Sequence, residues 1–255
     1  MPCLTDVLGK YYEELQTVGG RIHERASCCK EQESRVAGYL LIIIRFALDT
    51  FLSIASELGE KRVFQAAILA RSVYESAACV AWAFKTGKHD TLWADWLKDY
   101  VDWLKSAERL APWKPDAMVE LPNREAELRR FGIARGLPKP RGLFAALAKG
   151  ELTGRSAGEF ENLCYTIFGE LSFFSHGNGL ALASRVLPKS VVVQNTVFVC
   201  LMSSYWLTVC GRGFLAEDEE IPAIRSCEEQ RLRSLVAELN SCDFSSFDQL
   251  PQGGH

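Results

Sequence analysis

Two arginine–acid pairs lie inside segments that are otherwise apolar enough to be buried. Arg45 and Asp49 belong to one such run, and Arg71 and Glu75 belong to the next. A buried charge is costly unless it is paired, so these side chains are expected to meet one another. Each pair places the base four residues before the acid, which is the weaker order for support within one helix. We therefore expect the pairs to act between helices.

The spacing of these residues predicts a crossed charge quartet. If two antiparallel helices turn at Glu60, Arg45 and Glu75 lie equally far from the turn, and so do Asp49 and Arg71. Because both helices rise equally per residue, each arginine would then lie level with an acid of the other helix. Two interpretations follow. The quartet fixes the register of two buried helices, or it forms the floor of a polar pocket.

A later helical run brings three further polar side chains onto one line. Tyr165, Ser172 and His176 recur at helical spacing, so they share a stripe that could face a ligand. His176 falls in the last turn, where the helix dipole favours its protonated form. It either caps the helix or reaches the quartet and acts there as an acid or base.

These residues must be positioned by helices, because the apolar period is helical almost throughout and no run alternates as strand residues do. The fold class expected is all-α, a single multi-helix bundle with two long central antiparallel helices, the second and the third. The expected helices cover residues 5–29, 33–58, 61–86, 90–110, 123–135, 141–149, 156–176, 190–214 and 222–240.

The chain is expected to form one domain. Residues 1–240 make the bundle, with a variable proline-containing insertion at about 111–155, and residues 241–255 form a flexible C-terminal tail.

Composition excludes several classes of protein. With 255 residues, 48% hydrophobic and 24% charged, the chain has a globular composition, and its net charge of −3 gives no DNA-binding footprint. No phosphate-loop, dinucleotide or zinc-protease motif occurs, so we expect no cofactor and no metal. The absence of a signal-peptide pattern and of any C-x-x-C among nine cysteines favours reduced thiols and a cytoplasmic location.

One stretch is long enough to cross a bilayer. Residues 191–210 are largely apolar, but Gln194 and Asn195 interrupt them. A helix buried in the bundle is the favoured interpretation, and a membrane-associated protein is the alternative.

Arg71 and Glu75, followed about a hundred residues later by Ser172 and His176, form an R-S-x-x-E helix and a later S-x-x-S-H helix. With this pattern the chain resembles a group of uncharacterised bacterial all-helical proteins and, more broadly, the HEPN-like bundles of toxin–antitoxin, abortive-infection and RNA-cleaving systems. The resemblance implies a polar site in a helical bundle and a role in stress response or phage defence. The Arg-x(4–6)-His motif of HEPN ribonucleases is absent, because positions 169–171 are Gly, Glu and Leu.

The function expected is therefore that of a bacterial HEPN-like helical protein with a buried polar site, and no catalytic motif decides whether it is an enzyme. The alternative is a non-enzymatic interaction or small-molecule-binding bundle in which the charges only fix helix register. Candidate partners are RNA or a small molecule, and a second copy of the chain. The candidate catalytic residues are His176, Arg71 and Glu75, with Arg45, Asp49, Tyr165 and Ser172 in support.

Overall fold

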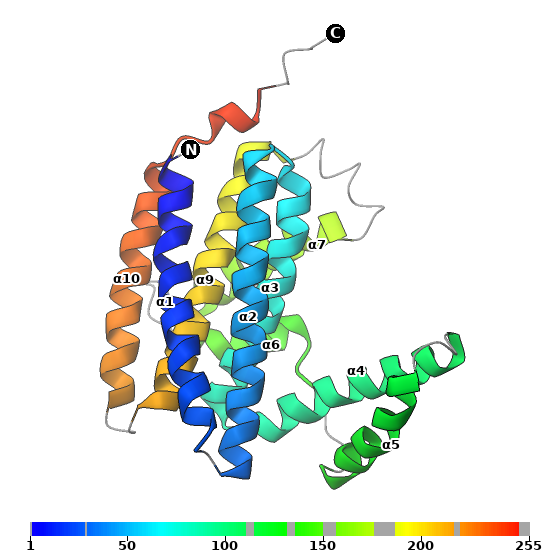
Figure 1. Cartoon of the computed structure of the whole chain (residues 1–255). Helices are drawn as coiled ribbons and strands as arrows, with labels where there is room; N and C mark the ends of the chain where they lie inside the picture. Colours follow the sequence, from blue (N-terminus) through cyan, green and yellow to red (C-terminus); the bar gives the residue numbers. More distant parts are fainter. Residues whose placement is uncertain are drawn as a thin grey trace.

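The helices expected from the sequence form and pack into a bundle (Figure 1). The computed structural model describes residues 2–28, 30–110, 115–131, 136–149, 157–175, 187–216 and 220–249. Within these ranges the chain is helical and has no strand, which confirms the all-α fold class. The elements are α1 (Pro2–Ala26), α2 (Glu31–Gly59), α3 (Val63–Thr86), α4 (His89–Leu110), α5 (Pro115–Arg130), α6 (Pro140–Ala148), α7 (Ala157–Ser175), α9 (Lys189–Leu215), α10 (Ile221–Ser241) and the 3₁₀ turn η2 (Ser245–Phe247).

Most of these boundaries lie within a few residues of those expected, and α5 is the exception. It begins at Pro115 rather than near residue 123, and it contains Pro122. Proline suits the first turn of a helix, where its missing N–H has no intrahelical partner. Inside a helix it removes one hydrogen bond and favours a kink without forbidding the helix. Pro115 therefore begins α5, and Pro122 lies within the helix without ending it.

The centre of the bundle is formed by α3 and α9, which share the most extensive contact in the described chain. Figure 1 shows α1, α2, α3, α9 and α10 running side by side along the length of the bundle. The predicted α2–α3 hairpin is confirmed, with Glu60, Lys61 and Arg62 between the helices. At Gly211 of α9 a Cβ atom would clash with Val18 of α1, so glycine allows these two helices to approach closely.

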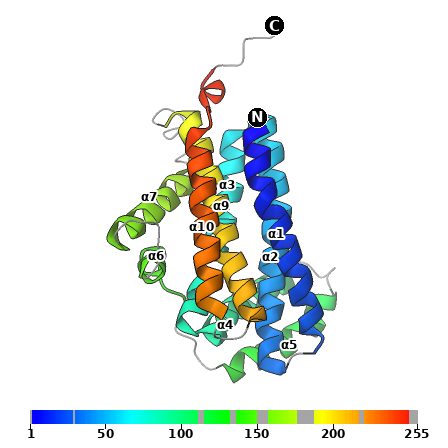
Figure 2. The ribbon, with the colours of Figure 1, turned by 90° about the vertical axis from the view of Figure 1, so that its left-hand side faces the viewer.

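The helices that follow the central hairpin leave the bundle and then return. In Figure 1, α4 and α5 project to one side of it. The chain comes back with α6, whose Leu143, Phe144 and Leu147 are buried, and with α7, which packs on α3 and α6. Figure 2 shows α7 running obliquely beside α9 and α10. After α10 the described chain continues through η2, where Phe247 is buried.

Two helices, α2 and α9, are long and apolar enough to span a membrane by length and composition. In the apolar window of α9, 78% of the residues are buried inside the bundle, against 50% for α2. The position of α9 therefore agrees with the expected buried helix, and one side of α2 is left open.

Most cysteines of the described chain are buried in the helical core. Cys79, Cys164, Cys200 and Cys210 are buried and form no disulfide bond, as expected. Burial raises the pKa of Cys79 to about 12, so its thiol is unreactive at neutral pH. Cys242 differs, because it is disulfide-bonded, and the expectation of reduced thiols fails there.

Candidate functional site

The predicted charge quartet does not form. Arg45 and Asp49 are exposed on α2, and neither makes an ion pair with any residue that the structure describes. Their distance in sequence from the turn at Glu60 predicts their height along the helix axis, but it does not predict which side of the helix they occupy. The side of α2 that faces the bundle carries Leu40, Ile44 and Ala47, so the stripe with Arg45 and Asp49 faces solvent.

Arg71, Glu75 and Ser172, by contrast, come together across the contact between α3 and α7. Arg71 Nε donates a hydrogen bond of 2.9 Å to Ser172 Oγ. Arg71 Nη2 lies 3.4 Å from Glu75 Oε2. The guanidinium carbon lies 5.0 Å from the centre of the Phe168 ring. We call these four residues the Arg71 cluster, and it is the part of the sequence prediction that the geometry assembles.

The two helices hold the guanidinium of Arg71 in a defined orientation. The rings of Phe64 in α3 and Phe174 in α7 pack 5.0 Å apart and fix one helix against the other. Ser172 Oγ donates to the carbonyl of Phe168 at 2.6 Å, so its lone pairs remain for Arg71. A planar guanidinium that stacks on a ring and donates to a hydroxyl is suited to bind an oxyanion with its remaining N–H groups. The Arg71 side chain is 21% exposed, so solvent reaches it.

The other two predicted residues on this line have different positions. Tyr165 is exposed, and the guanidinium of Arg141 lies 6.0 Å from its ring centre. It is therefore on α7 but is not a member of the Arg71 cluster. His176 lies outside the described residues and directly follows Ser175, where α7 ends. Its approach to Arg71 stays a prediction.

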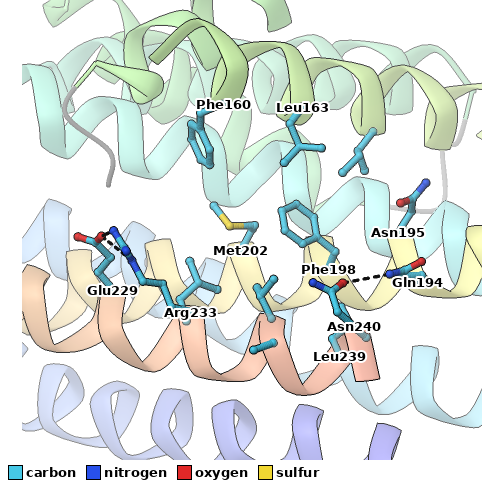
Figure 3. A pocket seen from close by; sticks show the side chains of 14 residues that line it. Phe160, Leu163, Gln194, Asn195, Phe198, Met202, Glu229, Arg233, Leu239 and Asn240 are labelled. Atoms are coloured by element: carbon cyan, nitrogen blue, oxygen red, sulfur yellow. Dashed lines mark hydrogen bonds and ion pairs between the residues drawn. The ribbon is translucent and has the colours of Figure 1, made fainter. Parts of the chain in front are cut away.

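A groove that the sequence did not predict lies between α7, α9 and α10 (Figure 3). Its volume is about 470 Å³. Apolar side chains from all three helices line its middle, among them Phe160, Leu163, Ile167, Phe198, Met202 and Val236. Volumes between about 300 and 1,000 Å³ are typical of small-molecule sites.

Polar pairs occupy both ends of this groove. At one end Arg233 Nε donates to Glu229 Oε1 at 3.0 Å. At the other end Gln194 Nε2 donates to Asn240 Oδ1 at 3.1 Å (Figure 3). The neighbouring Asn195 Nδ2 donates to Glu170 Oε2 at 2.6 Å. Burial raises the pKa of Glu170, and the bond from Asn195 offsets only part of that rise. In the sequence, the amides of α9 looked like interruptions of an apolar run, whereas they border the groove.

A second cluster of charges joins α1, α9 and α10, and we call it the lock cluster: Glu14, Arg212, Glu228 and Arg231. Arg212 Nη1 lies 2.9 Å from Glu228 Oε1, and Arg231 Nη1 lies 3.2 Å from Glu14 Oε2. Arg212 also donates to Glu14. The Glu228 side chain is 1% exposed. This is a crossed set of two arginines and two acids, but it joins α1 to α9 and α10 and not α2 to α3.

Burial acts differently on the two acids of the lock cluster. Burial raises the pKa of Glu228, and the charges of Arg212 and Arg231 compensate only in part. For Glu14, burial also acts to raise the pKa, but hydrogen bonds from Arg212 and Arg231 outweigh it and hold the pKa below the usual range. In the lock cluster the charged form of Glu14 is therefore stabilised by its arginine partners, whereas the charged form of Glu228 is disfavoured by burial.

No protein-family model, curated protein or solved structure matches this chain. Among the described residues, no group of three or more His, Cys, Asp or Glu side chains could hold a metal ion. The Arg71 cluster and the groove are therefore the two candidate sites of the described chain.

Proposed function

We propose that this chain is a bacterial HEPN-like helical protein in which the Arg71 cluster binds a phosphate group of RNA. The observation that carries the proposal is the bond from Arg71 Nε to Ser172 Oγ, which joins α3 to α7. The α7 segment has no arginine where the HEPN ribonuclease pattern has one. Arg71 supplies a guanidinium from α3 instead, and it does so at Ser172, which lies four positions before His176.

The chemistry of the cluster supports an oxyanion ligand. A guanidinium has five N–H donors, of which one donates to Ser172, while Glu75 forms an ion pair with Arg71 at 3.4 Å. Those that remain can bind phosphate oxygens as a fork. The Glu75 side chain is 43% exposed, and exposed ion pairs are worth little. A phosphate can therefore replace Glu75 as the partner of Arg71 at small cost.

The exposed ring of Tyr165 adds a second feature that suits RNA. It lies on α7, two turns before Ser172, and Arg141 stands over it. An exposed aromatic face can stack on an unpaired base, and single-stranded RNA is commonly bound in this way. His176 remains the predicted acid or base, and the role in stress response or phage defence follows from the resemblance alone.

The test compares two arginines in anisotropy titrations of a labelled single-stranded RNA. We expect Arg71→Met to weaken binding about tenfold, which corresponds to roughly 1.4 kcal/mol. Arg71→Lys should weaken it too, because an ammonium cannot reproduce the fork. Arg45→Met is the matched control, since Arg45 is exposed and has no ion pair with any described residue. Equal binding by the Arg71 variants and wild type would refute the proposal.

Cleavage is tested separately on the same RNA. His176→Ala should abolish any strand scission by the wild type and leave binding intact. If the wild type binds RNA without cleaving it, the protein is an RNA-binding module and not a ribonuclease.

A second candidate function is a bundle in which these charges only fix helix packing, and the same bond favours it. Because Arg71 and Ser172 come from different helices, their bond stabilises the contact of α3 with α7 even without a ligand. Loss of stability in Arg71→Met without any change in RNA affinity would select this candidate.

A further inference from the structure

We propose that the groove between α7, α9 and α10 binds a small amphiphile with an apolar body and a cationic amine head. This site is separate from the Arg71 cluster, and the inference does not depend on the proposed function. It rests on the volume of the groove, its apolar middle and the distribution of charge at its two ends.

The volume selects a small molecule rather than a peptide helix. An α-helix with side chains is 10–12 Å wide and rises 5.4 Å per turn, so one turn fills roughly 420–610 Å³. The groove of about 470 Å³ would therefore hold about one turn of a helix. A helix recognised by its apolar face needs anchors spread over at least two turns. A single small ligand can be held in this space, which lies in the range typical of small-molecule sites.

The middle of the groove suits a flexible hydrocarbon chain. Phe160 of α7 and Met202 of α9 line the groove and are buried, and Leu163 and Phe198 beside them are partly exposed (Figure 3). A methionine thioether is polarisable and adapts its shape to different apolar ligands. An apolar body placed here gains contact area without leaving a polar group unpaired.

The charge at the two ends selects the head group. The acid at one end, Glu229, is neutralised by Arg233. The acid at the other end, Glu170, has no basic partner among the described residues and accepts only from Asn195. Glu170 does not itself line the groove, but it follows Ile167 by about one turn of α7 and accepts from Asn195, which lines the groove. A carboxylate with no basic partner among the described residues therefore lies beside the amide-lined end of the groove.

An ammonium group satisfies this end with more than one bond. It can donate to the carboxylate of Glu170 as a charge-assisted hydrogen bond. It can also donate to Gln194 Oε1, which accepts from no described residue in the protein. A carboxylate head would face Glu170 instead and be repelled, so the groove discriminates between heads of opposite charge.

The experiment uses three ligands of equal chain length, decylamine, decanol and decanoate, each below its micelle-forming concentration. Each is titrated against the full-length protein loaded with the neutral fluorescent probe N-phenyl-1-naphthylamine. We expect decylamine to displace the probe at a concentration at least tenfold lower than decanoate, with decanol between them. Glu170→Gln removes the charge and keeps the size of the side chain. This variant should weaken the binding of decylamine about tenfold and leave the binding of decanol unchanged.

Two tryptophan variants locate the binding. Ala237 is exposed at the rim of the groove, so Ala237→Trp should block it and abolish probe displacement. Ala223, an exposed alanine of α10 that does not line the groove, provides the matched control Ala223→Trp. Helix content measured by circular dichroism verifies that both variants fold. RNA binding should be normal in Glu170→Gln, which separates this inference from the proposed function.

Two results would overturn the inference. Equal loss of probe binding in the two tryptophan variants would place the ligand outside the groove. Equal affinity for the three ligands, unchanged in Glu170→Gln, would show that the protein adsorbs apolar chains without recognising the head group.

Discussion

The lock cluster and the Arg71 cluster each contain arginine–glutamate ion pairing but differ in how far water reaches them. In the lock cluster the Glu228 side chain is 1% exposed and lies between three helices. In the Arg71 cluster Glu75 is 43% exposed and Arg71 is 21% exposed. Buried partners depend on one another, since neither can be solvated when the other is removed. Exposed partners can be exchanged for water or a ligand, so an arginine–glutamate pair stabilises packing in the lock cluster and leaves Arg71 accessible to the proposed ligand in the other.

The largest expected effect comes from removing one arginine of the lock cluster. Arg212→Met leaves Glu228 buried without its nearest base, so we expect a loss of about 3–5 kcal/mol of unfolding free energy at pH 7. The measurement is urea denaturation followed by circular dichroism. Because Glu228 can neutralise itself by binding a proton, the loss should be smaller at pH 4. A loss below 1 kcal/mol at pH 7 would show that the lock cluster does not hold the helices together.

The corresponding change in the Arg71 cluster should cost less. Arg71→Met removes one hydrogen bond from a charged group, while Ser172 keeps its bond to the carbonyl of Phe168. We expect a loss of about 1–2 kcal/mol. Arg45→Met, at an exposed site, should change stability by no more than about 0.5 kcal/mol. If Arg71→Met were as damaging as Arg212→Met, the contrast between the two clusters would be wrong.

The smallest effect is on the pH dependence of stability, and its sign differs between the two acids of the lock cluster. Glu14 has a lowered pKa in the folded state, so its contribution is present above the ordinary carboxyl range and is lost as pH falls through the folded value. Glu228 has a raised pKa, so its contribution is present below the ordinary range and is lost as pH rises through the folded value.

Glutamine variants separate these opposite contributions. Between pH 7 and pH 3, Glu14→Gln should lose less stability than wild type, and Glu228→Gln should lose more. Unfolding free energies measured at both pH values test this. The same slope for both variants would show that the two carboxylates are equivalent.

The sequence predicted helices well because helical periodicity is a local signal. The ends of α3 and α9, for example, follow from apolar runs bounded by Gly87 on one side and Pro188 on the other. Which face of a helix is buried depends on the helices packed against it, so Arg45 and Asp49 were wrongly assigned to the buried face of α2. An α2 with two partly apolar faces, one of them carrying the exposed Ile42 and Leu52, gave no local clue to the buried one.

The site was predicted in part for the same reason. Arg71 and Glu75 are neighbours on one helix, and Ser172 was selected by its spacing to His176. The contact between Arg71 and Ser172 spans 101 positions, and the contact between Glu14 and Arg212 spans 198. Such contacts arise from the order in which helices pack, which residue spacing along one chain does not encode. The groove was missed because three helices supply its wall.

One helix, α7, serves as a common wall. Its Ser172 side contacts Arg71, while its Phe160 and Leu163 side lines the groove. A ligand that tilts or slides α7 changes the geometry offered to both compartments at once. Thermodynamic linkage then makes the influence mutual: if an occupant of the groove alters the affinity of the Arg71 cluster by some factor, an occupant of that cluster alters the affinity of the groove by the same factor. Because α7 contributes residues to both sites, a shift of this helix would couple ligand binding at one to ligand binding at the other.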